Sequence, residues 1–572
     1  MTEQLNGFAE YVEAKRQAWK VPGAAVAVIQ EDEVIFAQGF GLRDVEANLP
    51  VTPETIFAIG SASKAFTAAA CAIAVDDGKL DWDKPVREYV PWFQMQDLFA
   101  STRMSARDLL CHRSGLPRHD LSWYGSTDTR EALIQRVRYL EANHDFRTYF
   151  QYQNFMYTTA GYLAGVVEGS SWEDVVRARI FQPLGMTSSQ FSVEESKKSG
   201  NAALPYYNRH EQIVKADFRN IDAIGPAGSI NSNLIDMIQW VKLHLNNGKW
   251  GDQAIVSEAN MNQLHSPQMS IADTLWREIF GVSMVSYGLG WFIMPYQSEI
   301  LLHHGGNIDG FSALVSFIPK RKIGMVVLTN LNSNLLTETI TYDLYDRLLG
   351  TQGKDWHDYF FGLTEKMKAQ AEEAKAKAAS DRVAGTQPSH ALDAYAGEFE
   401  NPGYGVFKVS KGDDGKLRGT FNGIGMVIEH YHYDIFELNV EEFEQKLLMT
   451  FTTDTKGNVT SLSVGLEPSA KPIVFTRLPD KAMQNRAFLE PFVGKYELMG
   501  MTVTISLRGD TQLIASVPGQ GDQTLEPYMD TTFTLKGLSG FSIKFVRDES
   551  GAVTEAVITQ PGATVSAKRV VE

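Results

Sequence analysis

The chain has 572 residues, of which 44% are hydrophobic and 21% are charged, and its formal net charge is −16. This length exceeds what a single hydrophobic core usually supports, so we expect about two to four domains. The negative charge, together with the lack of a basic cluster, argues against a nucleic-acid-binding surface.

The N-terminal segment, residues 1–6, has neither a basic region nor an apolar run, and no later stretch reaches about eighteen uninterrupted apolar residues. We therefore expect a cytoplasmic protein without a membrane span, although an exported chain whose signal had been trimmed would look the same. Cys71 and Cys111 both lie in apolar helical surroundings, which favours buried free thiols over a disulfide.

The N-terminal part of the chain predicts a helix, a hairpin and a second helix. Residues 4–19 carry apolar side chains at helical spacing, and a Pro-Gly pair then ends that helix. Residues 24–29 and 34–41 are β-rich runs that predict a hairpin. After a further extended apolar stretch, residues 65–75 form a strongly helical run.

The middle of the chain, from about residue 80 to 275, predicts mainly helices and loops. The pattern then returns to that of strands and ends in a helix. The predicted strands are 289–294, 301–304, 311–318 and 323–330, and the helix is 338–349. We expect an α+β fold in which the hairpin and the late strands share one antiparallel sheet, with the helical insert packed beside it.

The C-terminal part begins with a linker and continues with an internal repeat. Residues 364–380 are rich in Lys, Glu and Ala and predict a solvated helix, which a Gly-Thr-Gln-Pro sequence ends. Beyond it, residues 392–400 match residues 489–497. Each copy is a run of short strands with frequent turns, which predicts two small antiparallel barrels.

These patterns divide the chain into four parts. We expect a first domain over 1–352, a helical linker over 353–388, a β-barrel domain over 389–480, and a second barrel, a repeat of the first, over 485–572.

One short motif, Gly60-Ser61-Ala62-Ser63-Lys64, lies where the extended stretch gives way to the helical run. If Ser61 occupies the first turn, Lys64 lies on the same face of the helix, with its amine beside the hydroxyl. A nucleophilic serine needs such a base and a site for the oxyanion, and burial or nearby positive charge lowers the pKa of a lysine enough for this role. A helix cap followed by a solvated lysine explains the motif equally well when it is taken alone.

A second motif, Tyr152-Gln153-Asn154, lies in the helical insert. Its phenol can act as a general base if nearby cations lower its pKa, and its amide can bind both a lysine and a substrate carbonyl. By itself the tripeptide says little.

A third motif is the His-His-Gly-Gly-Asn sequence at 303–307, between two predicted strands. Its glycines would let a substrate backbone lie against the strand edge, His304 would face the site, and a backbone N–H beyond it would complete an oxyanion hole with that of Ser61. The alternative is a histidine pair that leads into a glycine turn without a catalytic part. No carboxylate or cysteine lies at ligand spacing, so we expect no metal.

Taken together, the order and spacing of S-x-x-K, Y-x-N and H-x-G resemble the serine hydrolase family that includes class C β-lactamases, D-Ala-D-Ala carboxypeptidases, D-aminopeptidases and related esterases. The resemblance covers about residues 8–350. Further stretches that carry it are 41–44, 109–116, 183–187, 226–229 and 287–291. It implies a class C β-lactamase-like transpeptidase fold, here followed by two lipocalin-like barrels such as D-aminopeptidases of this family carry.

The resemblance also implies roles for the first two motifs. Ser61 would be the acylated nucleophile and Lys64 its immediate proton partner. Tyr152 would act as general base and then assist deacylation. Asn154 would bond Lys64 and the substrate amide.

In the third motif, the resemblance places His304 where β-lactamases of the family usually have lysine. The alternative that the motif is shifted by one residue, to His303, stays open. Gly306 would leave room for the substrate, and the backbone N–H groups of Ser61 and Asn307 would hold the oxyanion. Lysine is a permanent cation, whereas histidine is mostly neutral near pH 7. This departure shifts the expectation from a β-lactamase toward a peptidase or an esterase.

We therefore expect a serine hydrolase that forms an acyl-enzyme on Ser61, needs no cofactor, and acts as a peptidase or amidase on short peptides or D-amino-acid amides. The alternatives are a carboxylesterase or β-lactamase on small acyl substrates, and a non-catalytic protein that binds peptides or β-lactams. A small molecule or short peptide is the expected partner. The sequence leaves open the stereochemistry of the substrate, whether water or an amine is the final acyl acceptor, and whether the chain forms a homo-oligomer.

Overall fold

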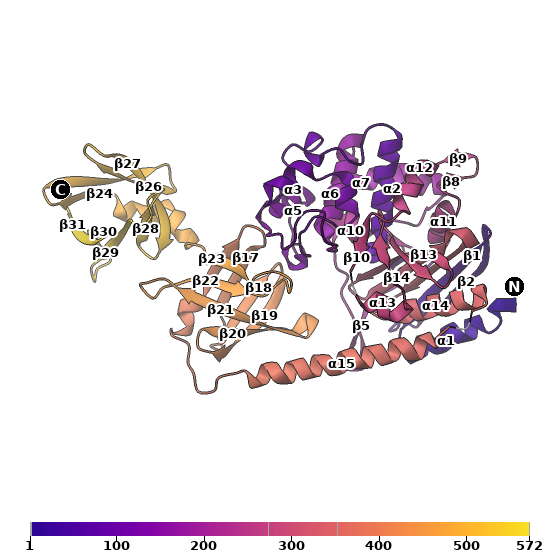
Figure 1. Ribbon diagram of the computed structural model, residues 1–572. Helices are drawn as coiled ribbons and strands as arrows, with labels where there is room; N and C mark the ends of the chain where they lie inside the picture. The colour runs from indigo at the N-terminus through magenta and orange to yellow at the C-terminus, as the bar shows by residue number, and fades with distance from the viewer. Residues whose placement is uncertain (1–2, 273, 352, 571–572) are drawn as a thin grey trace. The chain divides into compact units, whose positions relative to one another are not determined.

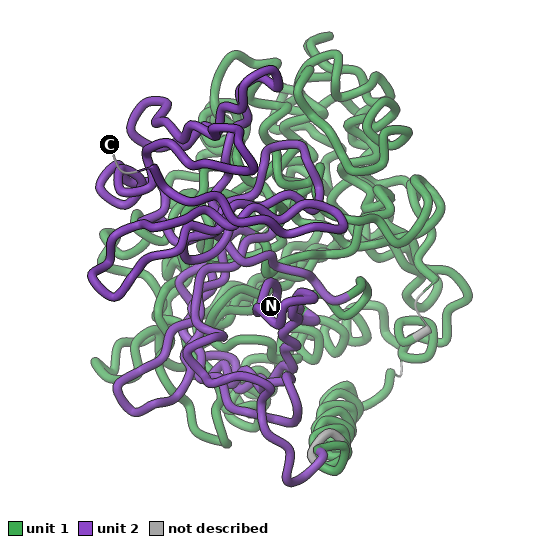
Figure 2. The backbone as a smooth tube through the Cα atoms, turned by 90° about the vertical axis from the view of Figure 1, so that its left-hand side faces the viewer, with its two compact units in different colours: residues 1–382, 402–404, 466–471 green, residues 383–401, 405–465, 472–572 purple. Residues whose placement is uncertain are grey.

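The computed structural model describes residues 3–272, 274–351 and 353–570. The chain divides into two compact units, which we describe separately (Figure 2). Unit 1 consists of Met1–Arg382, Pro402–Tyr404 and Leu466–Lys471, and unit 2 of Val383–Asn401, Gly405–Gly465 and Pro472–Glu572.

Unit 1 is built on a nine-stranded antiparallel sheet in the order β10-β11-β12-β13-β14-β15-β1-β2-β3 (Figure 1). The N-terminal hairpin joins the late strands through the pairing of β1 with β15, so the predicted shared sheet is confirmed. The strands are β1 Gly23–Gln30, β2 Glu33–Asp44, β3 Leu49–Pro50, β10 Met269–Ile271, β11 Val285–Tyr287, β12 Phe292–Tyr296, β13 Glu299–Ile308, β14 Phe311–Ile318 and β15 Ile323–Thr329.

Every residue of β14 and β15 is buried, because helices cover both faces of the central strands. Helix α11 (Leu234–Leu245) packs against β1, β14 and β15, and α14 (Leu336–Leu349) packs against β14 and β15. Helix α1 (Phe8–Ala18) packs against α14 and β2. Strands buried on both faces favour long apolar runs, and β15 has one up to Thr329. In β14 the run is broken by Ser312 and Ser316, whose buried hydroxyls bond Asn307 and Tyr345.

The helical insert surrounds α2 (Ser63–Asp76), whose many alanines allow close packing against α6 (Asn154–Glu168) and α10 (Gly225–Gly228). Shorter helices complete it: α3 Leu98–Arg103, α4 Ala106–Leu110, α5 Arg130–Arg136, α7 Trp172–Val176, α8 Gln182–Leu184, α9 Val193–Ser196, α12 Glu258–Leu264 and α13 Thr274–Phe280. Three two-stranded sheets pair β4 Phe57–Ala58 with β7 Asn231–Ser232, β5 Tyr206–Arg209 with β6 Gln212–Lys215, and β8 Lys249–Trp250 with β9 Gln253–Ala254.

Helix α15 spans Trp356–Ser380, so it begins before residue 364, where the sequence predicted its start. Its first turns are not solvated, because Trp356 and Phe360 are buried. The Trp356 ring lies 5.1 Å from that of Tyr342, and its indole N–H donates to Asp346 of α14 at 2.7 Å. The helix is therefore anchored on unit 1 before its Lys- and Glu-rich part begins.

Unit 2 contains the two predicted antiparallel barrels, and each is a closed barrel of eight strands. The first consists of β16 Gly397–Asn401, β17 Gly405–Lys411, β18 Leu417–Phe421, β19 Ile424–His432, β20 Ile435–Val440, β21 Gln445–Thr453, β22 Val459–Val464 and β23 Ile473–Arg477. The second consists of β24 Gly494–Leu498, β25 Met501–Arg508, β26 Gln512–Val517, β27 Gly521–Met529, β28 Thr532–Leu535, β29 Ser542–Arg547, β30 Val553–Gln560 and β31 Ala563–Arg569.

The sequence repeat marks the place where each barrel closes. Arg477, at the end of the first barrel, donates to the carbonyl oxygen of Ala396 at 2.6 Å. Arg569, at the end of the second, donates to the equivalent oxygen of Val493 at 2.8 Å. Each repeat motif is thus held by an arginine from its own last strand.

Candidate active site

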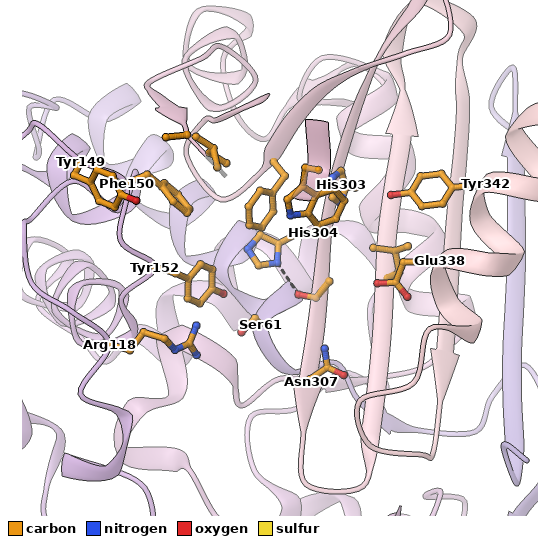
Figure 3. A pocket seen from close by; sticks show the side chains of 16 residues that line it. Ser61, Arg118, Tyr149, Phe150, Tyr152, His303, His304, Asn307, Glu338 and Tyr342 are labelled. Atoms are coloured by element: carbon orange, nitrogen blue, oxygen red, sulfur yellow. Dashed lines mark hydrogen bonds between the residues drawn. The ribbon is translucent and has the colours of Figure 1, made fainter. Parts of the chain in front are cut away.

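Ser61 lies in a one-turn 3₁₀ helix, η2 (Gly60–Ala62), directly before α2 (Figure 3). Lys64 follows in the first turn of α2 and is fully buried. Its Nζ atom lies 3.0 Å from Ser61 Oγ, 2.8 Å from Asn154 Oδ1 and 2.7 Å from the carbonyl oxygen of Ala227. The structure therefore brings together the serine, the lysine and the asparagine that the first two motifs single out.

The surroundings of Lys64 favour its neutral form. Burial lowers the pKa of Lys64 well below its usual value, and the charge of Arg118 lowers it further. Asn154 Oδ1 and the Ala227 carbonyl oxygen can only accept hydrogen bonds. A neutral amine donates to both of them, which leaves its lone pair for the Ser61 hydroxyl, the only one of the three partners with a proton to give.

Tyr152 lies against one amine and one guanidinium group. Lys64 Nζ is 4.7 Å and Arg118 Cζ is 4.9 Å from the centre of its ring. His112 packs its buried ring 4.3 Å from that of Tyr152 and accepts the Gln153 backbone N–H at 2.9 Å. Burial nevertheless raises the pKa of the Tyr152 phenol, and the opposing effects of Ser61 and Arg118 are smaller. The phenol therefore keeps its proton at neutral pH, which favours a proton-donor role.

Asp120 orients the amide of Asn154, although no motif in the sequence pointed to it. Asn154 Nδ2 donates to Asp120 Oδ1 at 2.9 Å, so the amide oxygen faces Lys64. The other carboxylate oxygen of Asp120 accepts from Arg118 Nε at 2.7 Å. Arg118 lies in an irregular segment, and Asp120 begins the one-turn 3₁₀ helix η4 (Asp120–Ser122). The sequence here carries no periodic signal, so only the tertiary structure reveals the two residues.

His304 lies in β13, and both of its ring nitrogens are engaged. Nδ1 is 2.7 Å from the carbonyl oxygen of Gly305, and Nε2 is 2.9 Å from the Tyr287 hydroxyl. Because a carbonyl oxygen only accepts, Nδ1 carries the proton and Nε2 accepts from Tyr287. Burial and the charge of Lys64 lower the pKa of His304 to about 3. His304 is therefore neutral near pH 7 and supplies no cation to the site.

His303 points away from its neighbour, because successive side chains of a strand alternate between faces. Its ring stacks on Phe292 at 5.5 Å and lies 5.4 Å from Trp276. The ring of His304, in contrast, lies 6.2 Å from that of Tyr152. Of the two histidines, His304 is thus the one beside the tyrosine of the second motif.

Two glycines allow η2 and β13 to touch through their backbones. A Cβ atom at Gly306 would lie 1.8 Å from the carbonyl oxygen of Ile59 and 2.9 Å from the nitrogen of Ser61. A Cβ atom at Gly60, whose φ is +51°, would lie 2.9 Å from the nitrogen of Asn307. The backbone nitrogens of Ser61 and Asn307, the predicted oxyanion donors, therefore belong to adjoining segments.

A cavity of about 580 Å³ opens at Ser61 (Figure 3). Its walls are largely aromatic and include Tyr149, Phe150, Tyr152, Trp276, Phe292 and Tyr342. Among the lining residues, Arg118 is the one permanent cation and Glu338 is the one carboxylate. The cavity has room for a short peptide or a similar organic substrate.

The described residues contain no group of three or more His, Cys, Asp or Glu side chains placed to hold a metal ion. None of the described helices combines the length and the apolar character needed to cross a membrane. Cys71 and Cys111 are buried free thiols, as predicted.

The sheet, the insert and the serine–lysine pair at the start of α2 define a β-lactamase-like serine hydrolase. The sequence model of the family described as Beta-lactamase matches residues 8–347, and the chain belongs to this family. A second model, described as Domain of unknown function (DUF3471), matches residues 381–477.

Particular relatives agree with this assignment. An unguisins hydrolase, ungD', of Aspergillus campestris is 29% identical over 433 residues, which cover 69% of this chain and 76% of that protein. An octameric penicillin-binding protein homologue from Pyrococcus abyssi superposes with a TM-score of 0.55 and 24% identity, over 82% of this chain and 100% of that one. D-amino acid amidase from Ochrobactrum anthropi SV3 superposes with a TM-score of 0.52 and 20% identity, over 61% of this chain and 99% of that one. The predicted class C β-lactamase-like fold is confirmed.

Proposed function

We propose that this β-lactamase-family serine hydrolase cleaves amide bonds in short peptides or D-amino-acid amides through an acyl-enzyme on Ser61. The observation that carries the proposal is the 3.0 Å contact between Ser61 Oγ and a buried Lys64 amine whose pKa is lowered. A neutral amine beside a serine hydroxyl is the arrangement that makes the hydroxyl nucleophilic.

In the acylation step, Ser61 Oγ attacks the substrate carbonyl and its proton passes to Lys64 Nζ. The backbone N–H groups of Ser61 and Asn307 hold the oxyanion that forms. Tyr152 gives its phenolic proton to the leaving nitrogen, and protonated Lys64 then returns a proton to the phenolate. Lys64 is thus neutral again when water attacks the acyl-enzyme.

Two features weigh against a β-lactam as the substrate. His304 is neutral where β-lactamases that resemble this chain usually carry a permanent cation. The relative from Aspergillus campestris is named for the hydrolysis of unguisins, not of β-lactams.

The test compares wild type with Ser61→Ala on D- and L-amino-acid p-nitroanilides, a short-chain p-nitrophenyl ester and a cephalosporin. We expect wild type to release p-nitroaniline with a preference for the D-anilide and to show an acyl adduct by intact mass, whereas Ser61→Ala shows neither. Turnover of the ester alone would replace the proposal with an esterase. Turnover that survives in Ser61→Ala would refute the acyl-enzyme on Ser61.

Arg118 and Asp120 should shift the pH dependence of kcat/KM in opposite directions, because they affect the pKa of Lys64 with opposite signs. Arg118→Met removes a positive charge, so the pKa of Lys64 rises and the acid limb of the profile moves to higher pH. Asp120→Asn removes a negative charge and moves the limb to lower pH. A pH–rate series on one neutral anilide checks both, and shifts of the same sign would contradict Lys64 as the group that titrates.

A further inference from the structure

The cavity at Ser61 continues to a second group of polar side chains. His303 from β13, Glu338 and Tyr342 from α14, and Trp276 line the same cavity as Ser61, and we call these four residues the inner compartment. Figure 3 shows Glu338 and Tyr342 next to each other, on the far side of the histidine pair from Arg118. None of the sequence motifs led to this compartment.

Two buried polar atoms in the inner compartment lack a partner. His303 is 3% exposed and Tyr342 is 1% exposed, and neither His303 Nε2 nor the Tyr342 hydroxyl has a hydrogen bond to any of the described residues. Native proteins pair almost all such atoms, with protein, water or a ligand. Two unpaired atoms beside one cavity therefore indicate that a polar group from outside the protein enters there.

Glu338 decides the charge of that group. Its carboxylate accepts a hydrogen bond from Thr337 Oγ1 at 2.5 Å, and no cation among the described residues contributes to its titration. Burial raises the pKa of Glu338, and burial together with the charge of Glu338 raises that of Tyr342. A ligand cation would favour the ionised carboxylate, whereas an anion would be repelled.

The three polar side chains offer as many acceptors as a primary ammonium group has donors. Burial lowers the pKa of His303 to about 4, so its ring is neutral, and Nε2 is an acceptor when Nδ1 carries the proton. An ammonium has three N–H donors, and the compartment offers the Glu338 carboxylate, the Tyr342 oxygen and His303 Nε2. The Trp276 ring and its aromatic neighbours can cover an aliphatic stem and attract the charge at its end.

We propose that the inner compartment binds the ammonium of a lysine- or ornithine-like side chain on the residue that supplies the scissile carbonyl. This inference rests on the proposed amide hydrolysis and specifies its substrate class. The aromatic wall holds the methylene stem, and Glu338, Tyr342 and His303 hold the ammonium.

The test uses two substrates that differ only in the amine, D-lysine p-nitroanilide and D-norleucine p-nitroanilide. Wild type should show a higher kcat/KM for the lysine substrate, and Glu338→Gln, which keeps the shape and removes the charge, should lower the lysine-to-norleucine ratio by about tenfold or more. Tyr342→Phe should lower it by a smaller factor. Glu195→Gln, an exposed glutamate of the same unit, is the matched control and should leave the ratio at the wild-type value.

A binding measurement separates this inference from the catalytic one. In Ser61→Ala, D-lysinamide should raise the melting temperature more than D-norleucinamide, and the difference should vanish in Ser61→Ala/Glu338→Gln. This result would support the inner compartment even if no substrate were hydrolysed by wild type. Equal effects of both amides on Ser61→Ala, or a kcat/KM ratio that Glu338→Gln leaves intact, would overturn it.

Discussion

Lys64→Met should lower kcat/KM for the preferred anilide by about 10²- to 10⁴-fold, the usual contribution of a general base. Methionine fills a similar volume but has no lone pair on nitrogen to accept the proton of Ser61. It also cannot donate to Asn154 and Ala227, which Lys64 contacts at 2.8 and 2.7 Å. Both losses act on the same step, because they remove the base and loosen the amide beside it.

The same substitution should also change how kcat/KM depends on pH. Wild-type kcat/KM should increase with pH as Lys64 loses its proton. Because burial lowers the pKa of Lys64, the midpoint of this increase should lie well below the usual pKa of a lysine. The residual activity of Lys64→Met should lack this rise. Lys84→Met, at a half-exposed lysine paired with Glu88, is the control and should behave as wild type. An acid limb that persists in Lys64→Met would assign the base to another group.

Gly306→Ala should reduce kcat/KM by about 10²- to 10³-fold, the effect expected when an oxyanion donor is displaced. The added Cβ would lie 1.8 Å from the carbonyl oxygen of Ile59, so either the turn that carries Ser61 or the strand that carries Asn307 must move. The rate of acyl-adduct formation, followed by mass, should fall with it.

Gly305→Ala is the matched control for this prediction, one residue away in the same strand. There the nearest atom to a new Cβ is the carbonyl oxygen of Ala313 at 3.6 Å, an ordinary contact. We expect kcat/KM within a few-fold of wild type and a similar circular dichroism spectrum for both variants. Equal losses in Gly305→Ala and Gly306→Ala would show that the close approach to Ile59 does not set the oxyanion geometry.

The parts of the site that the sequence predicts well are those fixed by local geometry. Ser61 and Lys64 lie three positions apart in one helical turn, so their contact follows from the helix itself. The shared sheet follows from the return of strand periodicity near the end of unit 1. In contrast, the bond between Asp120 and Asn154 and that between Tyr287 and His304 join segments far apart in the chain, and no local pattern encodes them.

Burial is the second quantity that the sequence does not supply. We expected Tyr152 to become a base if cations lowered its pKa; Arg118 supplies such a cation, but burial outweighs its effect. For α15, the Lys- and Glu-rich composition suggested a solvated segment, whereas Trp356 and Phe360 anchor its start. In both cases the packing of the folded chain, which the composition does not encode, decides whether the group is exposed to solvent.

The burial of Lys64 also links the stability of unit 1 to pH. In the unfolded chain this lysine titrates at its usual pKa, whereas in the folded protein it titrates well below it. Between the two values the unfolded state binds one more proton, so the free energy of unfolding rises with pH across that window. Below the folded-state pKa of Lys64, folding must bury a charged amine. The fold thus sacrifices stability at every pH below the usual lysine pKa to keep a proton acceptor ready at the serine.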